Sequence, residues 1–446
     1  MELTIDKVIK GGLGLGRTAD GQVVMVGRAL PGETVRVEVT RRHRGYLEAD
    51  LLEVLTPSSQ RVTPSCPVYE ECGGCDLQHA SYPEQLRIKN SILAETLGRA
   101  GLCKESGVEA ILAEPLPSPN TTAYRQRLRL QVGEDGRMGF FGRRSHDLVA
   151  VNHCPLAGER LNRVLAALVA HEASFALLAE ATALELLDDP GQERVVLLVH
   201  AKSGVRKAAR RAAVTLCREI PTVATVCFAR QGRTELACVA DTEDDWTDTP
   251  WLSFPLPSAL CNRPLAMGLA AGSFCQVNPG QNENCIRLLL ELVKDEPPGQ
   301  ALDLFCGMGN FSLPLAAAGW QVTGMDVQRS SITSAIRNAE ANGLEEKCRF
   351  ETASAKAAIN RLVGEGRRFD LILLDPPRSG CADLIPLLPD LGARRIVSIS
   401  CDPATLARDL TGLVGHGYRI ESGRMVDMFP QTSHLESVVS LVRQED

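Results

Sequence analysis

The first 56 residues alternate apolar and polar side chains in short runs that turn residues interrupt. Val35, Val37 and Val39 lie at every second position, and Asp20-Gly21 and Pro31-Gly32 separate neighbouring runs. A period of two is typical of strands with one buried face, and several short strands joined by tight turns predict a small barrel. We therefore expect an OB-like, five-stranded β-barrel over residues 1–56. Such barrels often bind oligonucleotides, although a fold by itself does not establish a function.

Residues 57–270 follow a mixed pattern. A stretch rich in prolines and cysteines precedes a helical repeat of apolar residues over about 83–99, and strands such as RLRLQV and ERVVLLVH then alternate with helices such as ERLNRVLAALVAH. This order of elements predicts a central α+β domain, whose purpose the pattern does not reveal.

Residues 271–446 contain helices alternating with strands that are almost wholly apolar. ALDLF, QVTGMD, FDLILLD and RRIVSIS have the continuous apolar character of strands buried on both faces. The alternation predicts a doubly wound, Rossmann-like parallel sheet, with at least one antiparallel strand at its end from the final LESVVSLV.

Composition and charge narrow the classes of protein. With 44% hydrophobic and 23% charged residues in 446, the chain is expected to fold into several domains. It contains no apolar run of membrane-spanning length, and MELTIDKVIKGG lacks the regions of a signal peptide, so we expect a cytoplasmic protein without membrane contact. The net charge of −7 is unusual for a nucleic-acid binder, but Arg41-Arg42-His43-Arg44 and similar clusters could follow a phosphate backbone.

A glycine-rich loop, Asp303–Asn310, follows one of the buried strands and opens a helix. Glycines at this place let the backbone approach an adenosine ligand, and Asp326, which ends the next strand, can accept hydrogen bonds from ribose hydroxyls. The loop has no third glycine at the dinucleotide spacing. It therefore favours S-adenosylmethionine over a nicotinamide cofactor, for which we identify no hydride-accepting partner site.

Two further motifs suggest carbon methylation of a pyrimidine. Asp375-Pro376-Pro377-Arg378 ends a strand, and its prolines hold Asp375 rigidly where such sheets bind ligands. Cys401 follows the next strand, and a thiolate that adds to carbon 6 of the ring makes carbon 5 nucleophilic. A base must then remove the carbon-5 proton, and Glu436 is our candidate. A structural role for Cys401 and a surface role for Glu436 stay open.

Fifteen cysteines in a reducing compartment favour metal or catalytic roles over disulfides for some of them. Cys66, Cys72 and Cys75 share one loop, and Cys154 would complete four thiolate ligands. Zinc and iron–sulfur clusters both accept four cysteines, but three in one loop with a distant fourth suit a [4Fe–4S] cluster. Four coincidental thiols are the alternative.

Together these motifs resemble the RNA 5-methyluridine methyltransferases over essentially the full length, and most of all the iron–sulfur members that act on 23S rRNA and carry an N-terminal TRAM barrel. The resemblance implies an S-adenosylmethionine-dependent reaction in which Cys401 is the nucleophile and Glu436 the base. It also implies that the four cysteines named above hold a [4Fe–4S] cluster.

The same resemblance assigns further site residues. The family's Phe-x-Gln-x-Asn motif matches Phe274–Asn278, which implies that Gln276 contacts the cofactor and Phe274 stacks on the target base. Ser354 stands where relatives often place an asparagine or aspartate beneath the adenine. The residues expected to bind the cofactor are Gln276, Phe305, Gly307, Gly309, Asn310, Asp326, Ser354 and Asp375; those expected to bind the substrate are Phe274, Asp375 and Arg378.

We expect, then, an enzyme that methylates carbon 5 of a uridine in RNA through a covalent adduct between Cys401 and carbon 6. The favoured substrate is 23S rRNA, and the same chemistry on tRNA is the alternative. A hypothesis of another class is a catalytically idle RNA-binding or redox-sensing iron–sulfur protein. No obligate protein partner is implied.

Overall fold

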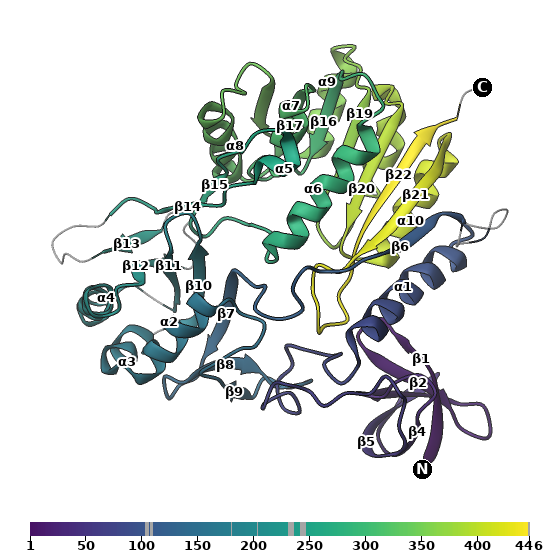
Figure 1. Ribbon diagram of the computed structural model, residues 1–446, viewed down its shortest axis with the longest axis vertical. Helices are drawn as coiled ribbons and strands as arrows, with labels where there is room; N and C mark the ends of the chain where they lie inside the picture. Colours follow the sequence, from purple (N-terminus) through teal and green to yellow (C-terminus); the bar gives the residue numbers. More distant parts are fainter. Residues whose placement is uncertain are drawn as a thin grey trace. The chain divides into compact units, whose positions relative to one another are not determined.

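The computed structural model, drawn in Figure 1, describes residues 1–102, 107, 110–179, 181–202, 204–230, 236–240 and 247–444. The chain divides into two compact units. The first unit comprises Met1–Thr121, Pro376–Pro386 and Ser398–Asp446, and the second comprises Thr122–Asp375 and Leu387–Val397. No single helix among the described residues has the length and hydropathy of a membrane span; one helix pair, Glu159–Ala170 and Glu172–Leu178, bent by 93°, reaches them only jointly.

The first unit opens with a closed five-stranded barrel, which confirms the prediction from the alternating pattern. Its strands follow the order β1-β2-β3-β5-β4 around the barrel. Their bounds are β1 Glu2–Ile9, β2 Leu13–Arg17, β3 Val23–Gly27, β4 Thr34–Arg42 and β5 Tyr46–Thr56. Leu3 and Ile5 on β1 and Val35 and Val37 on β4 point inward with at most 5% of their surface exposed, so the period of two fills the barrel core.

An irregular loop of residues 57–81, which carries three cysteines, leads from the barrel to helix α1 (Tyr82–Arg99). Helix α1 buries Ile88, Ile92 and Leu93 and packs against β1 and helix α10 (Pro403–Gly415). The rest of the first unit is part of a sheet in the order β20-β22-β21-β6, with bounds β6 Leu112–Leu116, β20 Arg395–Ser400, β21 Tyr418–Val426 and β22 Glu436–Arg443. Strand β22 is antiparallel to β21, which is parallel to β6.

The second unit contains a seven-stranded sheet in the order β13-β12-β11-β10-β7-β8-β9, in agreement with the α+β pattern. Its strands are β7 Arg127–Val132, β8 Met138–Phe141, β9 Leu148–Ala150, β10 Ala181–Asp189, β11 Arg194–Ala201, β12 Val223–Arg230 and β13 Ala237–Val239. The helices in this part of the chain are α2 Glu159–Ala170, α3 Glu172–Leu178 and α4 Lys207–Glu219. A small antiparallel pair, β14 Trp251–Ser253 with β15 Gly268–Ala270, and helix α5 Ser258–Cys261 follow in sequence.

The second unit also contains the expected parallel strands, in the order β18-β17-β16-β19 followed by the first residues of β20. The strands are β16 Gln300–Leu304, β17 Gln321–Asp326, β18 Cys348–Thr352 and β19 Leu371–Leu374, and the intervening helices are α6 Pro279–Val293, α7 Ser312–Ala317, α8 Arg329–Ala341 and α9 Ala355–Gly364. A 3₁₀ helix, η2, spans Ile385–Leu391. Every residue of β19 and β20 is buried, as their mainly apolar sequences predict.

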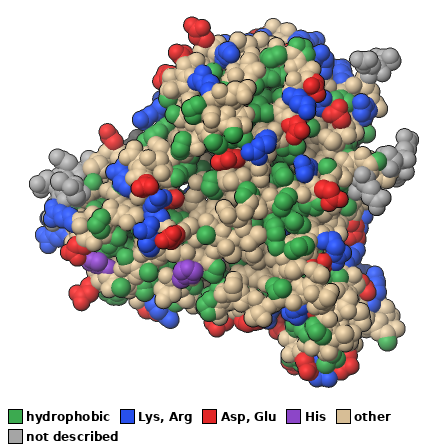
Figure 2. Space-filling model, in the orientation of Figure 1, with side chains coloured by type: hydrophobic (Ala, Val, Ile, Leu, Met, Phe, Trp, Pro, Cys, Tyr) green, Lys and Arg blue, Asp and Glu red, His purple; other side chains and the backbone are tan. Residues whose placement is uncertain are grey.

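Acidic and basic side chains are interspersed on the face of the protein drawn in Figure 2. As far as the described side chains go, this face lacks the uniformly basic surface common in nucleic-acid binders, which agrees with the net charge of −7.

Candidate active site

Cys401 lies in the turn between strand β20 and helix α10, within the first unit. Strand β20 is wholly buried, and Cys401, the residue after its carboxyl end, is half-buried. Asp402 caps the helix, because its Oδ1 accepts hydrogen bonds from the amides of Ala404 at 2.9 Å and Thr405 at 3.1 Å. Pro403 supplies the preset first helical residue. The thiol is thus held on a rigid turn at the positive end of a helix.

Burial opposes ionisation of Asp402, but hydrogen bonds from Lys10 and from the helix amides outweigh it and hold the pKa of this carboxyl below its ordinary value. Asp402 is therefore an anion at neutral pH, fixed beside the thiol-bearing residue.

Glu436 is the first residue of β22 and only 5% of it is exposed, so it is not a surface carboxylate. The next residue, Ser437, donates a hydrogen bond from its Oγ to the carbonyl oxygen of Ser400 at 3.0 Å, and this bond is buried. Ser400 in turn precedes Cys401. The structure therefore brings the candidate nucleophile and the candidate base to adjoining strands, each one residue away from the same hydrogen bond.

The Asp-Pro-Pro-Arg motif crosses from one unit to the other. Asp375 follows β19 in the second unit, and burial raises the pKa of its carboxyl to about 7. Arg378 belongs to the first unit, where its side chain is exposed and its carbonyl oxygen accepts a hydrogen bond from Thr405 Oγ1 on α10 at 3.2 Å. The segment after the motif is thus joined to the helix that follows Cys401.

The glycine-rich loop bends sharply after β16. Phe305, Gly307 and Gly309 all have positive φ, at 69°, 56° and 85°, and Phe305 is the costly one because it has a side chain. The carboxylate of Asp326 accepts a hydrogen bond from the amide of Gly307 at 3.0 Å. Asp326 therefore fixes the conformation of the loop from the end of the neighbouring strand. Folds of this kind bind nucleotides at these carboxyl ends of the strands.

Asp303, which precedes the loop, is fully buried on β16. Burial raises the pKa of its carboxyl to about 7, a hydrogen bond from Ser312 opposes that shift, and the nearby charges of Asp375 and Asp326 add to it. Three interacting acids near the carboxyl ends of neighbouring strands are typical of a ligand site, although ion-pair networks with a purely structural role also perturb pKa values.

The segment that contains Phe274 and Gln276 is fixed through its backbone. Gln126 Nε2 donates to the carbonyl of Gln276 at 2.7 Å, and Arg127 Nη1 donates to the carbonyl of Ser273 at 3.2 Å. Phe274 nevertheless has 68% of its surface exposed. An aromatic ring held out from a rigid backbone is suited to stacking on a base.

Gln276 and Asn310 both line a pocket of about 320 Å³ in the second unit, together with Asn282 and Met308. Asn282 on α6 and Asn310 exchange two hydrogen bonds between their side-chain amides, both of 2.8 Å. Two residues that were expected to bind the cofactor are thus brought to one cavity. Ser354 instead caps α9, where its exposed Oγ accepts a hydrogen bond from the amide of Ala357 at 3.3 Å.

The four cysteines expected to bind a cluster are half-buried thiols outside any disulfide. Cys66, Cys72 and Cys75 lie in the loop of the first unit, and the amide of Gly74 donates to Cys72 Sγ at 3.3 Å. Cys154 lies in the second unit. Among the described residues, no group of three or more histidine, cysteine or acidic side chains is arranged to hold a metal ion. A bound cluster therefore stays a prediction.

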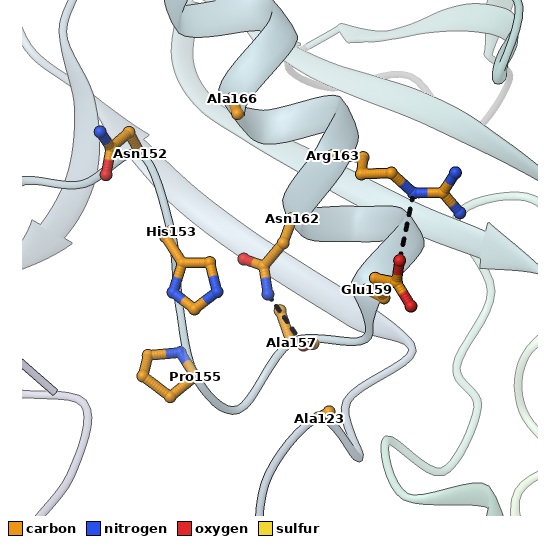
Figure 3. A pocket seen from close by; sticks show the side chains of 9 residues that line it. All are labelled: Ala123, Asn152, His153, Pro155, Ala157, Glu159, Asn162, Arg163 and Ala166. Carbon is orange, nitrogen blue, oxygen red and sulfur yellow. Dashed lines mark hydrogen bonds and ion pairs between the residues drawn. The ribbon is translucent and has the colours of Figure 1, made fainter. Parts of the chain in front are cut away.

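The turn around Cys154 is held by Asn162 of α2, whose hydrogen bond to Ala157 is drawn in Figure 3. The side chain of Asn162 accepts from the amide of Cys154 at 2.8 Å and donates to the carbonyls of Cys154 and Ala157, both at 3.0 Å. The neighbouring pocket of about 560 Å³ includes His153 and Pro155, which flank the cysteine.

Sequence reasoning missed the residues that support the site. Gln126, Arg127, Asn282 and Ser437 carry no motif, and the bond from Gln126 to Gln276 joins residues 150 positions apart. Only Ser437 had a usable signal, because it adjoins Glu436 at the start of a predicted strand.

Two protein-family descriptions match this chain: "tRNA (Uracil-5-)-methyltransferase" over residues 111–444 and "TRAM domain" over residues 1–52. A 23S rRNA (uracil(1939)-C(5))-methyltransferase of Aeromonas salmonicida (strain A449) is 32% identical over 443 residues, which cover 98% of this chain and 95% of that protein. An uncharacterized RNA methyltransferase of Thermosynechococcus vestitus is also 32% identical and covers 99% of this chain and 97% of its own. The solved structure of the Pyrococcus abyssi tRNA (uracil-54, C5)-methyltransferase with S-adenosyl-L-homocysteine gives a TM-score of 0.73 at 25% identity, and the match covers 99% of this chain and 100% of that one.

Proposed function

This chain belongs to the tRNA (uracil-5-)-methyltransferase family, and we propose that it transfers the methyl group of S-adenosylmethionine to carbon 5 of a uridine in RNA. The observation that supports the proposal is the Ser437–Ser400 hydrogen bond, which joins the residue before Cys401 to the residue after Glu436 within one unit. A thiol and a carboxylate in that relation are the two groups that carbon-5 methylation needs.

The reaction begins with the target uridine taken out of its stack, at a cost of a few kcal/mol, and the exposed Phe274 ring supports the base. The thiolate of Cys401 adds to carbon 6, and the electron pair released to carbon 5 attacks the methyl carbon of the sulfonium. S-adenosylhomocysteine leaves with the sulfonium bonding pair. Glu436 then takes the proton from carbon 5, the double bond re-forms, and the thiolate is expelled.

The proposed cofactor is supported by the loop from Asp303 to Asn310, by Asp326 and by the pocket that contains Gln276. The Pyrococcus abyssi relative was solved with S-adenosyl-L-homocysteine, the product of this cofactor. We assign the adenosine to Phe305, Asp326 and Ser354, and the amino-acid portion to the region of Gln276, Asn310 and Asp375. Calorimetric titration with S-adenosylhomocysteine tests the assignment, and Asp326→Ala is expected to weaken binding at least about tenfold because a charged hydrogen bond is lost.

The proposed substrate is 23S rRNA, because relatives that match almost the whole chain carry that activity in their names. Transfer RNA is the second candidate, because the Pyrococcus abyssi relative, whose solved structure matches 99% of this chain, is a tRNA (uracil-54, C5)-methyltransferase. Mapping 5-methyluridine in both RNA classes from a deletion strain decides between them.

We also infer that Cys66, Cys72, Cys75 and Cys154 hold a [4Fe–4S] cluster. Four thiolates are the donor set that such a cluster takes, and the amide of Gly74 supplies an N–H to one sulfur, as is common around cluster ligands. When bound, the cluster would brace the loop by tying its sulfurs to iron. Anaerobic purification followed by iron, sulfide and zinc analysis tests this; zinc without iron, or neither metal, contradicts it.

Two substitutions test the mechanism. Cys401→Ala is expected to bind RNA but transfer no methyl group, whereas the control Cys217→Ala, at a half-buried cysteine on α4, keeps full activity. Glu436→Gln is expected to accumulate a covalent RNA adduct that survives denaturant, since the proton at carbon 5 is not removed. Full methyl transfer by Cys401→Ala contradicts the nucleophile, and the absence of any adduct with Glu436→Gln contradicts the base.

A further inference from the structure

The turn between barrel strands β1 and β2 lies against the two segments that carry the candidate nucleophile and base. Lys10 Nζ forms an ion pair with Asp402, the residue after Cys401. Gly12 is buried, and a Cβ atom placed on it would lie 2.6 Å from Asp76 Cβ and 3.4 Å from Ser433 Cβ. The barrel backbone therefore approaches Asp76 more closely than any side chain would allow.

Asp76 connects this turn to the loop before Glu436. Its Oδ2 accepts hydrogen bonds from both the amide and the hydroxyl of Ser433, at 3.1 and 2.9 Å. The amides of Asp76 and Leu77 both donate to the carbonyl of Gln431, at 3.1 and 3.0 Å. Four hydrogen bonds thus join the cysteine loop, residues 57–81, to the loop of residues 427–436, which ends at the candidate base.

The stability of this arrangement comes from packing and from the partly buried hydrogen bonds of Asp76 rather than from the Lys10–Asp402 pair. The Lys10 side chain is 57% exposed, and ion pairs in solvent contribute about 0–1 kcal/mol. Asp76 and Ser433 instead meet next to the buried Gly12, where an added Cβ would come within 2.6 Å of Asp76, so that one of the two segments must shift.

We propose that Gly12 and Asp76 are positioning residues for the loop of residues 427–436, the base loop. The barrel would then help to build the catalytic half-site, which comprises Cys401 and Glu436, as well as bind RNA. The inference rests on the proposed methyltransferase function for its kinetic consequence. Its structural part, that the β1–β2 turn holds residues 427–436 in place, stands on the contacts within the first unit.

Gly12→Ala, with Gly11→Ala as its matched control, tests the proposal. Both glycines have a positive φ, 73° and 92°, so both substitutions strain the backbone in a similar way. No described atom lies within 4 Å of a Cβ at Gly11, whereas at Gly12 the new methyl meets Asp76. Only the second variant should displace the base loop.

The expected result is a kcat for RNA methylation about 10- to 100-fold lower in Gly12→Ala, with KM for RNA changed less than about threefold, and near-normal values for Gly11→Ala. Hydrogen exchange of residues 427–436 in the full chain should rise in Gly12→Ala alone. Equal kcat and equal exchange in the two variants, or a change confined to KM, would overturn the proposal.

Asp76→Ala and Asp76→Asn give a second test if Gly12→Ala does not fold. The asparagine keeps a side-chain oxygen that can accept from Ser433, so it should restore most of the kcat and exchange protection that alanine loses. Normal kcat in Asp76→Ala sinks the positioning role. If the wild-type chain methylates no RNA, the proposed function fails, and the exchange comparison alone still decides whether the turn holds the loop.

Discussion

Lys89 and Asp427 form an ion pair whose side chains are both fully buried in the first unit, and its removal has a predictable cost. Lys89 Nζ on α1 lies 2.5 Å from Asp427 Oδ1 and 2.9 Å from the carbonyl of Phe429. Burial lowers the pKa of Lys89, against the attraction of Asp427. Lys89→Met keeps the side chain's length but leaves a buried carboxylate without its cation. Breaking such a pair costs about 3–5 kcal/mol.

Two measurements on the full chain test this: urea unfolding, and hydrogen exchange read out in peptides from residues 82–99 and 418–443. A loss of about 3 kcal/mol raises the opening constant of this region roughly 100-fold. Asp427 is also the first residue of the loop that leads to Glu436. Loss of the ion pair should therefore lower kcat as well as the free energy of unfolding.

The matched control is the double variant Lys89→Met/Asp427→Asn, which removes both charges and should recover at least half of the loss. A single variant that costs less than about 1 kcal/mol, or a double variant no better than the single one, would refute the reasoning, because burial would then not be the source of the penalty.

Three other perturbations have clear expected outcomes. The native state keeps the proton on Asp303 up to a pKa of about 7, whereas an ordinary aspartate releases it near 3.8, so native stability falls as pH rises through that window. Asp303→Asn should therefore be relatively more stable than wild type at pH 8 than at pH 5, by up to about 3 kcal/mol in denaturant titrations, because about two pH units of that window lie above pH 5. Gly309→Ala should lower Tm more than Gly307→Ala, because φ is positive at both but only at Gly309 does a Cβ meet a neighbouring side chain, at 2.3 Å. Ser437→Ala leaves the buried carbonyl of Ser400 without its donor, which costs about 1–3 kcal/mol, and kcat should fall without a change in cofactor affinity measured by calorimetry.

The sequence predicted those elements whose period reflects burial on a defined face. The barrel strands alternate, and the strands β16, β19 and β20 are mainly apolar and almost wholly buried, so both kinds were predicted. Strand β21 was missed because its sequence, YRIESGRMV, mixes arginine, glutamate and glycine with apolar residues and is buried only in part. Strand β6 was missed because its partner β21 lies some 300 residues later in the chain.

Candidate site residues could be named from the sequence where the proposed chemistry depends on a local motif. The glycine-rich loop and the turn with Cys401 each follow a predicted strand. Their position at the carboxyl ends of the strands could therefore be inferred from the order of the elements. Support from distant segments was beyond sequence reasoning. Ser354, for example, matched a cofactor position by resemblance, yet its hydroxyl caps a helix that the pattern did not predict.

The long-range contacts of the first unit bear on what a domain means for this enzyme. The change of period near residue 270 suggests that chemistry begins there, but the segment with Cys401 and Glu436 is held by residues from the first quarter of the chain. Lys10 contacts Asp402 across 392 positions, Asp76 contacts Ser433 across 357, and Lys89 contacts Asp427 across 338. Because these contacts include a fully buried ion pair and partly buried hydrogen bonds, they contribute to folding and not only to docking. The segment that carries the candidate nucleophile and base therefore depends on the barrel, the cysteine loop and α1 together with the C-terminal strands, and our proposal predicts that a sequence change in the barrel alters catalysis without touching RNA.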